Sequence, residues 1–472
     1  MIWLVGLFVI AFAFLAIRHL EWALMLIFFA LPSYLIRFNA GVPMTLLEAM
    51  ILVVAAVWVW QNRSSLLLGI KSSWRRGVKA PERVPYPFGG ELIALLVVAL
   101  VAVGLAGFSN AALGLWKAYF FEPALLYLVA VNVIGKKEAP LVRKLNMIIW
   151  PLAASALVVS LFAVYQKFTG QFIDNALWAA PATRRVVSFF GYPNAVGLYV
   201  ESIIFLALGL LIFSRQCSGT KCSRNRLILA FTVSFSLLAI IFAKSVGASL
   251  GVAAGFATFA LLYGKRSRKA VLALMALGIV AVVLVQPLRH QAAKYATLND
   301  FSGQVRRAQW RETWTMLKAD NHWLWGTGLS NYQTAIKSFH KDGIFVEDYD
   351  DPNSHRKLVF NAEYRAAHWQ PLEIYMYPHN IILNFWTELG LAGLLAFVWI
   401  IAKFFRMIAV ELKNCQQKNE RVFLIGTAAA MVAVIVHGLV DVPYFKNDLA
   451  VIFWLLVALV ALFRLGRLSN KS

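Results

Sequence analysis

A histidine stands where a long polar segment gives way to an apolar one, in the tetrapeptide Tyr377-Pro378-His379-Asn380. The run Ile381 to Ala402 that follows is apolar enough to enter a membrane, so His379 is expected at a membrane surface. A neutral imidazole there could take a proton from a hydroxyl group near neutral pH. His379 is therefore a candidate general base, and the alternative is an interfacial histidine that only caps or packs.

Two other places offer positive charge on the same side of the membrane. Arg184 and Arg185 precede the stretch Ser188 to Asn194, in which Asn194 is predicted to cap the next helix. Lys244 lies in a tight corner between two apolar runs. Because a guanidinium suits phosphate oxygens, these cations and His379 together indicate a pocket for an anionic head group. Each cation could instead be an interfacial anchor.

The helix predicted after Pro378 has a polar face. Asn380, Asn384 and Glu388 recur at four-residue spacing and therefore share one side of an otherwise apolar helix. This side is predicted to face the protein interior, because polar groups in a membrane helix rarely face lipid. The other charged residues within apolar runs are expected either to pair locally or to serve a function; they are Glu48, Lys117, Glu122, Glu201 and Asp441.

Membrane helices must position these residues. The chain has 472 residues, 60% of them hydrophobic, and a mean hydropathy of +0.67, which is too apolar for a soluble globular protein. We predict an all-α polytopic membrane protein with about 12 or 13 transmembrane helices. The apolar runs lie near 1–17, 20–36, 43–60, 90–108, 112–134, 146–166, 194–214, 226–243, 246–264, 270–288, 380–402, 423–440 and 449–463.

The net charge of +22 is concentrated in short connections, which is the pattern of positive-inside retention and argues against nucleic-acid binding. The rule places the connections at 61–89, 135–145, 215–225, 265–269 and 403–422 inside the cell. It places 167–193, 244–246, 289–378 and 441–448 outside, together with His379 and Arg185. The excess of basic residues therefore predicts the orientation of the protein in the membrane.

The outside segment 289–378 is predicted to be a folded, mainly helical periplasmic domain between the transmembrane bundle 1–288 and the C-terminal helices and short tail 379–472. Its many tryptophans argue against disorder. A helix over about 303–319, capped by Asp300 or Ser302, would present Arg307 beside aromatic side chains and end at the turn Trp325–Gly328. The acidic cluster at 348–351 fits no EF-hand loop and is predicted to be a solvated turn.

These elements resemble the O-antigen ligase and polymerase superfamily of membrane glycosyltransferases. The resemblance covers about 110 to 455 and rests on the order and spacing of short motifs. They are Arg185 through Pro193-Asn194, the corner Ser245-Val246-Gly247-Ala248, Arg307-x-x-Trp310 leading to Trp325-Gly326-Thr327-Gly328 and Tyr332, Pro378-His379-Asn380 with Glu388-x-Gly390-x-x-Gly393, and His437-Gly438-Leu439-Val440-Asp441 followed by Lys446-Asn447-Asp448.

The resemblance implies metal-independent, inverting transfer of a glycan from a polyprenyl (undecaprenyl) diphosphate carrier to an acceptor hydroxyl at the periplasmic face of the bacterial inner membrane. It implies His379 as the catalytic base and Arg185, Lys244 and Arg307 as residues that hold the diphosphate or line the site. Arg184, Asn380 and Glu388 are predicted to support them. Family ligases usually have arginine directly after the corner serine, whereas this chain has Val246.

The expected partners are the carrier-linked glycan donor, a glycan, lipid or protein acceptor, and membrane lipid. No cofactor, metal or nucleic acid is expected. Motifs shared by the superfamily leave ligase and polymerase open as alternatives. A carrier-lipid flippase or transporter is less favoured, because no inverted repeat or helix interrupted at mid-membrane is apparent in the sequence.

Overall fold

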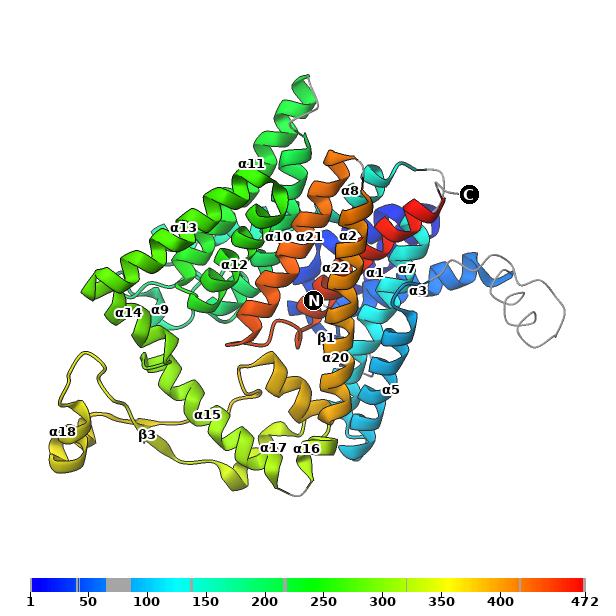
Figure 1. Ribbon diagram of the computed structural model, residues 1–472. Coiled ribbons are helices and arrows are strands. Elements are labelled where there is room, and N and C mark those ends of the chain that lie inside the picture. Colours follow the sequence, from blue (N-terminus) through cyan, green and yellow to red (C-terminus); the bar gives the residue numbers. More distant parts are fainter. Residues whose placement is uncertain are drawn as a thin grey trace.

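A computed structural model describes residues 2–39, 41, 43–64, 86–135, 139–214, 219–319, 321–415 and 417–469 (Figure 1). Within these ranges nine helices are long and apolar enough to cross a membrane, and four shorter helices are also apolar. Each of the predicted apolar runs coincides with one of these helices, so the predicted all-α membrane fold is confirmed. The predicted inside connections at 61–89, 135–145 and 215–225 fall partly outside the described residues.

The N-terminal part of the fold is a series of helices with one short hairpin. The hairpin pairs β1 (Arg37–Asn39) with β2 (Pro43–Thr45) in antiparallel register. A π-helical segment, η2, continues α6 directly into α7. The helices are α1 (Ile2–Arg18), α2 (Leu20–Phe29), the 3₁₀ turn η1 (Leu31–Leu35), α3 (Leu46–Gln61), α5 (Gly89–Leu105), α6 (Asn110–Trp116), η2 (Lys117–Phe121), α7 (Glu122–Ile134) and α8 (Leu141–Thr169).

The remaining long helices complete the bundle. They are α10 (Pro193–Ser214), α11 (Thr220–Ala243), α12 (Val246–Tyr263), α13 (Lys265–Leu284), α20 (Ile381–Asn414), α21 (Lys418–Gly438) and α22 (Asn447–Ser469), and the short α9 (Ala176–Ala179) precedes them. Helix α21 packs against both α10 and α12. Small residues allow the close approach, because a Cβ at Gly426 of α21 would lie only 2.6 Å from the carbonyl oxygen of Phe205 in α10. This packing holds the start of α10 near the end of α21.

The large loop, residues 289–378, is folded and lies mainly at one end of the bundle (Figure 1). Its strands β3 (Gly343–Phe345) and β4 (Trp369–Pro371) pair antiparallel. The helices in or leading into it are α14 (Gln286–Ala296), α15 (Phe301–Lys318), α16 (His322–Trp325), α17 (Tyr332–Ile336), the 3₁₀ turn η3 (Lys337–Phe339), α18 (Ser354–Phe360) and α19 (Ala362–Ala367). The helix predicted over 303–319 is α15, but the prediction that Trp325–Gly328 ends it is wrong, since α16 intervenes.

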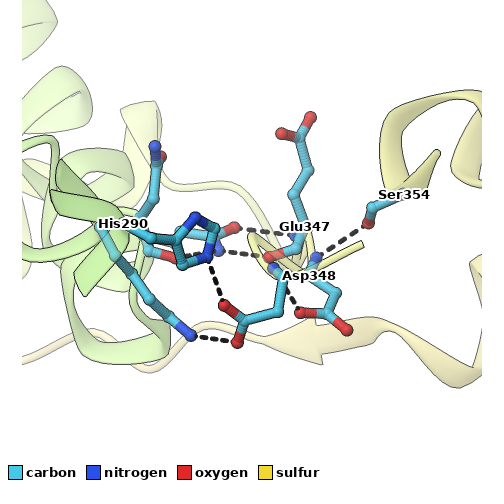
Figure 2. Close-up of polar contacts among 8 residues, drawn as sticks. His290, Glu347, Asp348 and Ser354 are labelled. Atoms are coloured by element: carbon cyan, nitrogen blue, oxygen red, sulfur yellow. Dashed lines mark hydrogen bonds and ion pairs between the residues drawn. The ribbon is translucent and has the colours of Figure 1, made fainter. Parts of the chain in front are cut away.

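Hydrogen bonds close the acidic part of the large loop onto α14 and α15. Figure 2 shows His290 of α14 directed at this segment, and its Nε2 lies 2.8 Å from Asp350 Oδ1. Lys294 Nζ contacts the other oxygen of Asp350 at 2.6 Å, and the hydrogen bonds from Lys294 and His290 lower the pKa of Asp350. The amide of Asp348 donates to Ser354 Oγ at 2.8 Å. The acidic residues therefore serve to fold the turn against the helices.

Helix α20 is broken at Gly390, although no interrupted membrane helix is apparent in the sequence, and the large loop docks into the break. Gly390 has φ +71°, a conformation that side chains rarely adopt. The amide of Thr327 donates to the carbonyl of Thr387 at 2.6 Å, and a Cβ at Gly326 would lie 2.6 Å from the Gly390 nitrogen. The backbone of the loop thus lies directly against the helix, where only glycine leaves room.

Candidate active site

His379 lies just before α20, in a left-handed backbone conformation with φ +47°. The next residue, Asn380, caps the helix: its side-chain oxygen accepts from the amides of Ile382 and Leu383, each at 3.0 Å. The Asn380 amide group also donates to the carbonyl of Leu439 at 2.9 Å, which ties α20 to the end of α21. His379 therefore lies in the bend directly before the first turn of α20.

Helix α15 holds the segment that leads to His379. Gln309 Nε2 donates to the carbonyl of Tyr377 at 2.8 Å, and Trp310 Nε1 donates to the carbonyl of Pro378 at 2.7 Å. A non-glycine residue with positive φ costs about 1 kcal/mol or more and persists only where its surroundings impose it. These two hydrogen bonds from one side and the Asn380 cap from the other impose it here.

The imidazole of His379 faces a buried carboxylate. Its Nδ1 lies 3.7 Å from Asp441 Oδ1, and the rings of Tyr375 and Tyr377 meet it edge-on at 5.1 and 5.0 Å between centroids. The side chain of His379 is 23% exposed, whereas that of Asp441 is 2% exposed. The ring is therefore enclosed on its Nδ1 side and open to solvent elsewhere.

Asp441 is ionised in this setting. Burial alone would raise the pKa of the Asp441 carboxyl, but the contact with His379 and the positive charge available to the nearby His437 lower it to about 2. Its Oδ1 accepts from the amide of Val442 at 2.9 Å, and its Oδ2 accepts from Asn194 Nδ2 at 3.3 Å. A charge held in place by two donors is a fixed partner for the imidazole.

Asn194 connects this carboxylate to Arg185. Arg185 Nη2 donates to Asn194 Oδ1 at 3.3 Å, and Arg185 Nε donates to the carbonyl of Ala243 at 2.9 Å. The predicted capping role of Asn194 is wrong, because α10 begins at Pro193 and the Asn194 side chain bridges Arg185 and Asp441. We call Arg185, Asn194, Asp441 and His379 the polar chain.

A second guanidinium lies close to the polar chain. Burial lowers the pKa of Arg185, and the positive charge of Arg306 on α15 lowers it further. Arg306 makes no hydrogen bond or ion pair with the described residues. Two like charges brought together without a bridging carboxylate repel each other, and an anion between them would relieve that repulsion.

The other predicted cations lie around this centre. Arg307 lines an open groove of about 350 Å³ with Trp310, Arg311, Trp314 and Leu383, one helix turn from His379 along α20. Lys244 ends α11 in a left-handed conformation, and its carbonyl accepts weakly from Arg185 Nη2 at 3.5 Å. Its side chain is exposed, as is that of Val246, which begins α12. The structure thus brings Arg185 into the polar chain, places Lys244 next to Arg185, and places Arg307 in a separate groove that reaches the first turn of α20.

Arg184 and Glu388 have structural contacts. Arg184 donates to the carbonyls of Ala179 and Lys167, each at 3.0 Å, and so secures the C-terminal end of α8. Glu388 is buried and its Oε2 accepts from the amide of Ser330 at 2.7 Å, which joins the large loop to α20 beside the break. Asn384 is also buried, so the polar face predicted on this helix does look inward.

Of the other charged residues predicted within membrane helices, Glu48, Lys117 and Glu201 form ion pairs. Lys117 Nζ lies 3.1 Å from Glu48 Oε2, so Lys117 pairs with Glu48 and not with Glu122. His437 Nδ1 lies 2.8 Å from Glu201 Oε2, and both side chains are buried. These contacts tie α3 to η2 and α10 to α21.

Three members of the site were not singled out as functional from the sequence. The sequence predicts Asn194 as a cap and Asp441 only as one of several charged residues within apolar runs, and its motifs indicate Arg307 and not its neighbour Arg306. The signal for Asp441 was its position in an outside connection, where a carboxylate could meet His379. No local signal identifies Arg306, because its side of α15 is set by how the loop packs.

Residues 231–398 match the family model described as O-antigen ligase. The matched segment includes Lys244, Arg306, Arg307, His379 and Glu388, whereas Arg185, Asn194 and Asp441 lie outside it. A comparison with curated protein sequences gave no match.

Proposed function

Because the chain belongs to the O-antigen ligase superfamily, we propose that it transfers a glycan from an undecaprenyl diphosphate carrier to an acceptor hydroxyl at the outer face of the bacterial inner membrane. The observation that carries the proposal is the polar chain. It links an accessible imidazole, through a buried carboxylate and an amide, to a guanidinium that has a second guanidinium nearby. This transfer requires at least a general base and an adjacent site that binds the anionic leaving group.

His379 is the proposed general base. Asp441 lies on the Nδ1 side of the ring, so a proton on Nδ1 leaves Nε2 with a lone pair toward the open side. The acceptor hydroxyl would give its proton to Nε2 while its oxygen attacks the anomeric carbon of the donor sugar. Asp441 is a positioning residue that orients the ring and stabilises the imidazolium that forms.

Arg185 and Arg306 are proposed to hold the carrier diphosphate. The bond between the anomeric carbon and the diphosphate oxygen breaks as the new glycosidic bond forms, and its electron pair leaves with the carrier diphosphate. Two guanidiniums in a partly buried site stabilise that developing charge better than they would in water. Attack from the face opposite the leaving group inverts the anomeric centre, and the scheme needs no metal ion.

The groove lined by Arg307, Trp310 and Trp314 is proposed to take part of the glycan. Indole rings pack against sugar rings, and exposed arginines can hydrogen-bond to hydroxyl or acidic groups of the sugar. The groove opens beside α20 one turn beyond His379. A substrate whose reacting group lies at His379 would therefore extend into it.

The direct test is transfer by the purified full-length protein supplied with an undecaprenyl diphosphate-linked glycan and candidate acceptors. Release of carrier diphosphate together with a new acceptor-linked glycan, also in the presence of a chelator, would support the proposal. Product found only on a second carrier-linked glycan would identify a polymerase of the same superfamily. Movement of the carrier-linked glycan across a proteoliposome membrane without any transfer would overturn the proposal in favour of a flippase.

Arg306→Gln is expected to raise the KM for the donor about tenfold, because a charge-assisted hydrogen bond to phosphate is lost. Initial rates over a range of donor concentrations measure the effect. The matched control is Arg356→Gln, which removes the same charge from an exposed position of α18 in the large loop, and Arg307→Gln compares the adjacent position of α15. A larger increase in donor KM for Arg307→Gln than for Arg306→Gln would contradict the placement of the diphosphate between Arg185 and Arg306.

A further inference from the structure

A cavity of about 700 Å³ lies at the end of the bundle opposite His379, between α5, α20 and α22. Its lining is both apolar and charged. Trp399, Met407 and Val410 contribute the apolar part, and Lys403, Arg406 and Arg464 contribute cations. The positive-inside distribution predicts this end to be cytoplasmic.

The two carboxylates of the cavity are already neutralised by neighbouring cations. Lys403 Nζ lies 2.8 Å from both carboxylate oxygens of Glu91, and both Arg464 and Arg467 bind Glu411, at 3.1 and 2.9 Å. Glu91 and Glu411 are each 2% exposed, so these pairs are needed to bury them. The local net charge is +2, because four cations lie here with two carboxylates. The cations are Lys403, Arg406, Arg464 and Arg467, and the carboxylates are Glu91 and Glu411.

Arg406 is the cation of the cavity that has no partner among the described residues. No ion pair or hydrogen bond joins its side chain to any residue in the described ranges, and it is exposed. A guanidinium on a membrane helix without a counter-charge is costly unless it reaches water or the phosphate layer. The guanidinium of Arg406 thus presents N–H donors that have no acceptor among the described residues, at the mouth of the cavity.

The mouth of the cavity is predicted to face lipid near the headgroup layer. Leu395, Trp399 and Val410 are 57%, 50% and 40% exposed and lie with Arg406 on one side of α20, which is the arrangement of a lipid-facing stripe. Arg406 comes 16 residues after the break at Gly390, a rise of about 24 Å along the helix, compared with a hydrocarbon thickness of about 30 Å. The stripe therefore leads from the membrane interior to a cation near its far surface.

We propose that this cavity binds an anionic phospholipid of the leaflet opposite the candidate active site. The phosphate would lie against Arg406 and Arg464, and an acyl chain would follow Trp399 and Met407 toward the membrane interior. A basic pocket between membrane helices is suited to such headgroups. The three helices around the cavity come from distant parts of the chain, so the lipid would brace α5 and α22 against α20.

The test is native mass spectrometry of the purified full-length protein with added phosphatidylglycerol or phosphatidylcholine. Wild type should retain phosphatidylglycerol in preference to phosphatidylcholine, and Arg406→Gln should weaken that retention about tenfold. The matched control is Arg143→Gln, which removes an exposed arginine in the first turn of α8, also at the end predicted to be cytoplasmic and outside the cavity. An equal loss in both variants would show only general charge attraction and would overturn the proposal.

A second variant separates lipid from a soluble anion. Ala402→Trp fills the apolar lining without removing a charge, because Ala402 is exposed and lines the cavity. It should reduce phosphatidylglycerol retention, whereas glycerol phosphate should fail to displace the lipid from wild type. Displacement by glycerol phosphate, or unchanged lipid retention in both Ala402→Trp and Arg406→Gln, would overturn the proposal.

Discussion

Replacing His379 with asparagine is expected to lower the rate of glycan transfer about a thousandfold, because a positioned base contributes on the order of 10²–10⁴ to such a step. Asparagine is the sharper choice over alanine. It tolerates the left-handed backbone that His379 adopts, so the bend before α20 should survive the change. The measurement is the initial rate at saturating donor and acceptor, with donor binding measured separately.

His355→Asn provides the control for this experiment. His355 lies on the same large loop, and its side chain is 79% exposed. It contacts Glu347 at 2.9 Å and not the polar chain. Its rate should stay within about twofold of wild type, as expected for a surface position. Full turnover by His379→Asn would remove the proposed base, whereas loss of donor binding in that variant would indicate a role in binding.

Asp441→Asn is expected to lower kcat about a hundredfold while leaving the donor KM nearly unchanged. The amide keeps one acceptor oxygen in place of two, so it can accept from Val442 or from Asn194 but not from both. It also carries no charge to stabilise the imidazolium, and neutral partners of this kind cost catalysis heavily in other enzymes. Steady-state kinetics with varied donor separate the two parameters. A rise in KM with unchanged kcat would assign Asp441 to binding.

The control for Asp441→Asn is Glu388→Gln, another neutralised carboxyl that is buried in the same part of the protein. Glu388 binds the amide of Ser330 and does not contact His379, so its substitution should change thermal stability more than kcat. Equal losses of kcat in the two variants would argue that any buried charge matters here. A fall confined to Asp441→Asn would support its positioning role.

The low pKa of Asp441 also gives the site a defined response to acid. A carboxyl whose folded-state pKa is about 2, below its ordinary value of about 3.9, stabilises the fold above that ordinary value. This contribution is lost as the pH falls from about 4 toward 2. The charge of Asp441 is therefore constant across the neutral range, and any pH dependence of transfer in that range must come from other groups.

The helices of the bundle were predictable because their apolar runs are local properties of the chain. The break in α20 was not, although Gly390 is visible in the sequence. Its conformation depends on Gly326 and Thr327, which approach from a loop about 60 residues earlier in the chain. Glycine within an apolar run permits such a break but does not require it.

The chemistry of the candidate site was predictable from the sequence, whereas the contacts between its residues were less so. His379 and Arg185 could be named because residue type and a position outside the membrane are sufficient to nominate a base and a phosphate ligand. Asn194 and Asp441 are 247 residues apart, and only the packing of α10 against α21 brings them together. Arg306 and Arg307 differ only in the side of α15 on which they lie, which tertiary contacts decide.

The docking of the large loop against α20 has a consequence for how the protein is made. Thr327 is held by Thr387, Ser330 by Glu388, and the carbonyls of Tyr377 and Pro378 by α15, so the loop and the next helix complete each other. During synthesis the loop leaves the ribosome before α20, and it can dock only after α20 has been inserted. A chain interrupted before α20 would carry the loop without the surface on which it docks, and the loop would be open to proteolysis in that state.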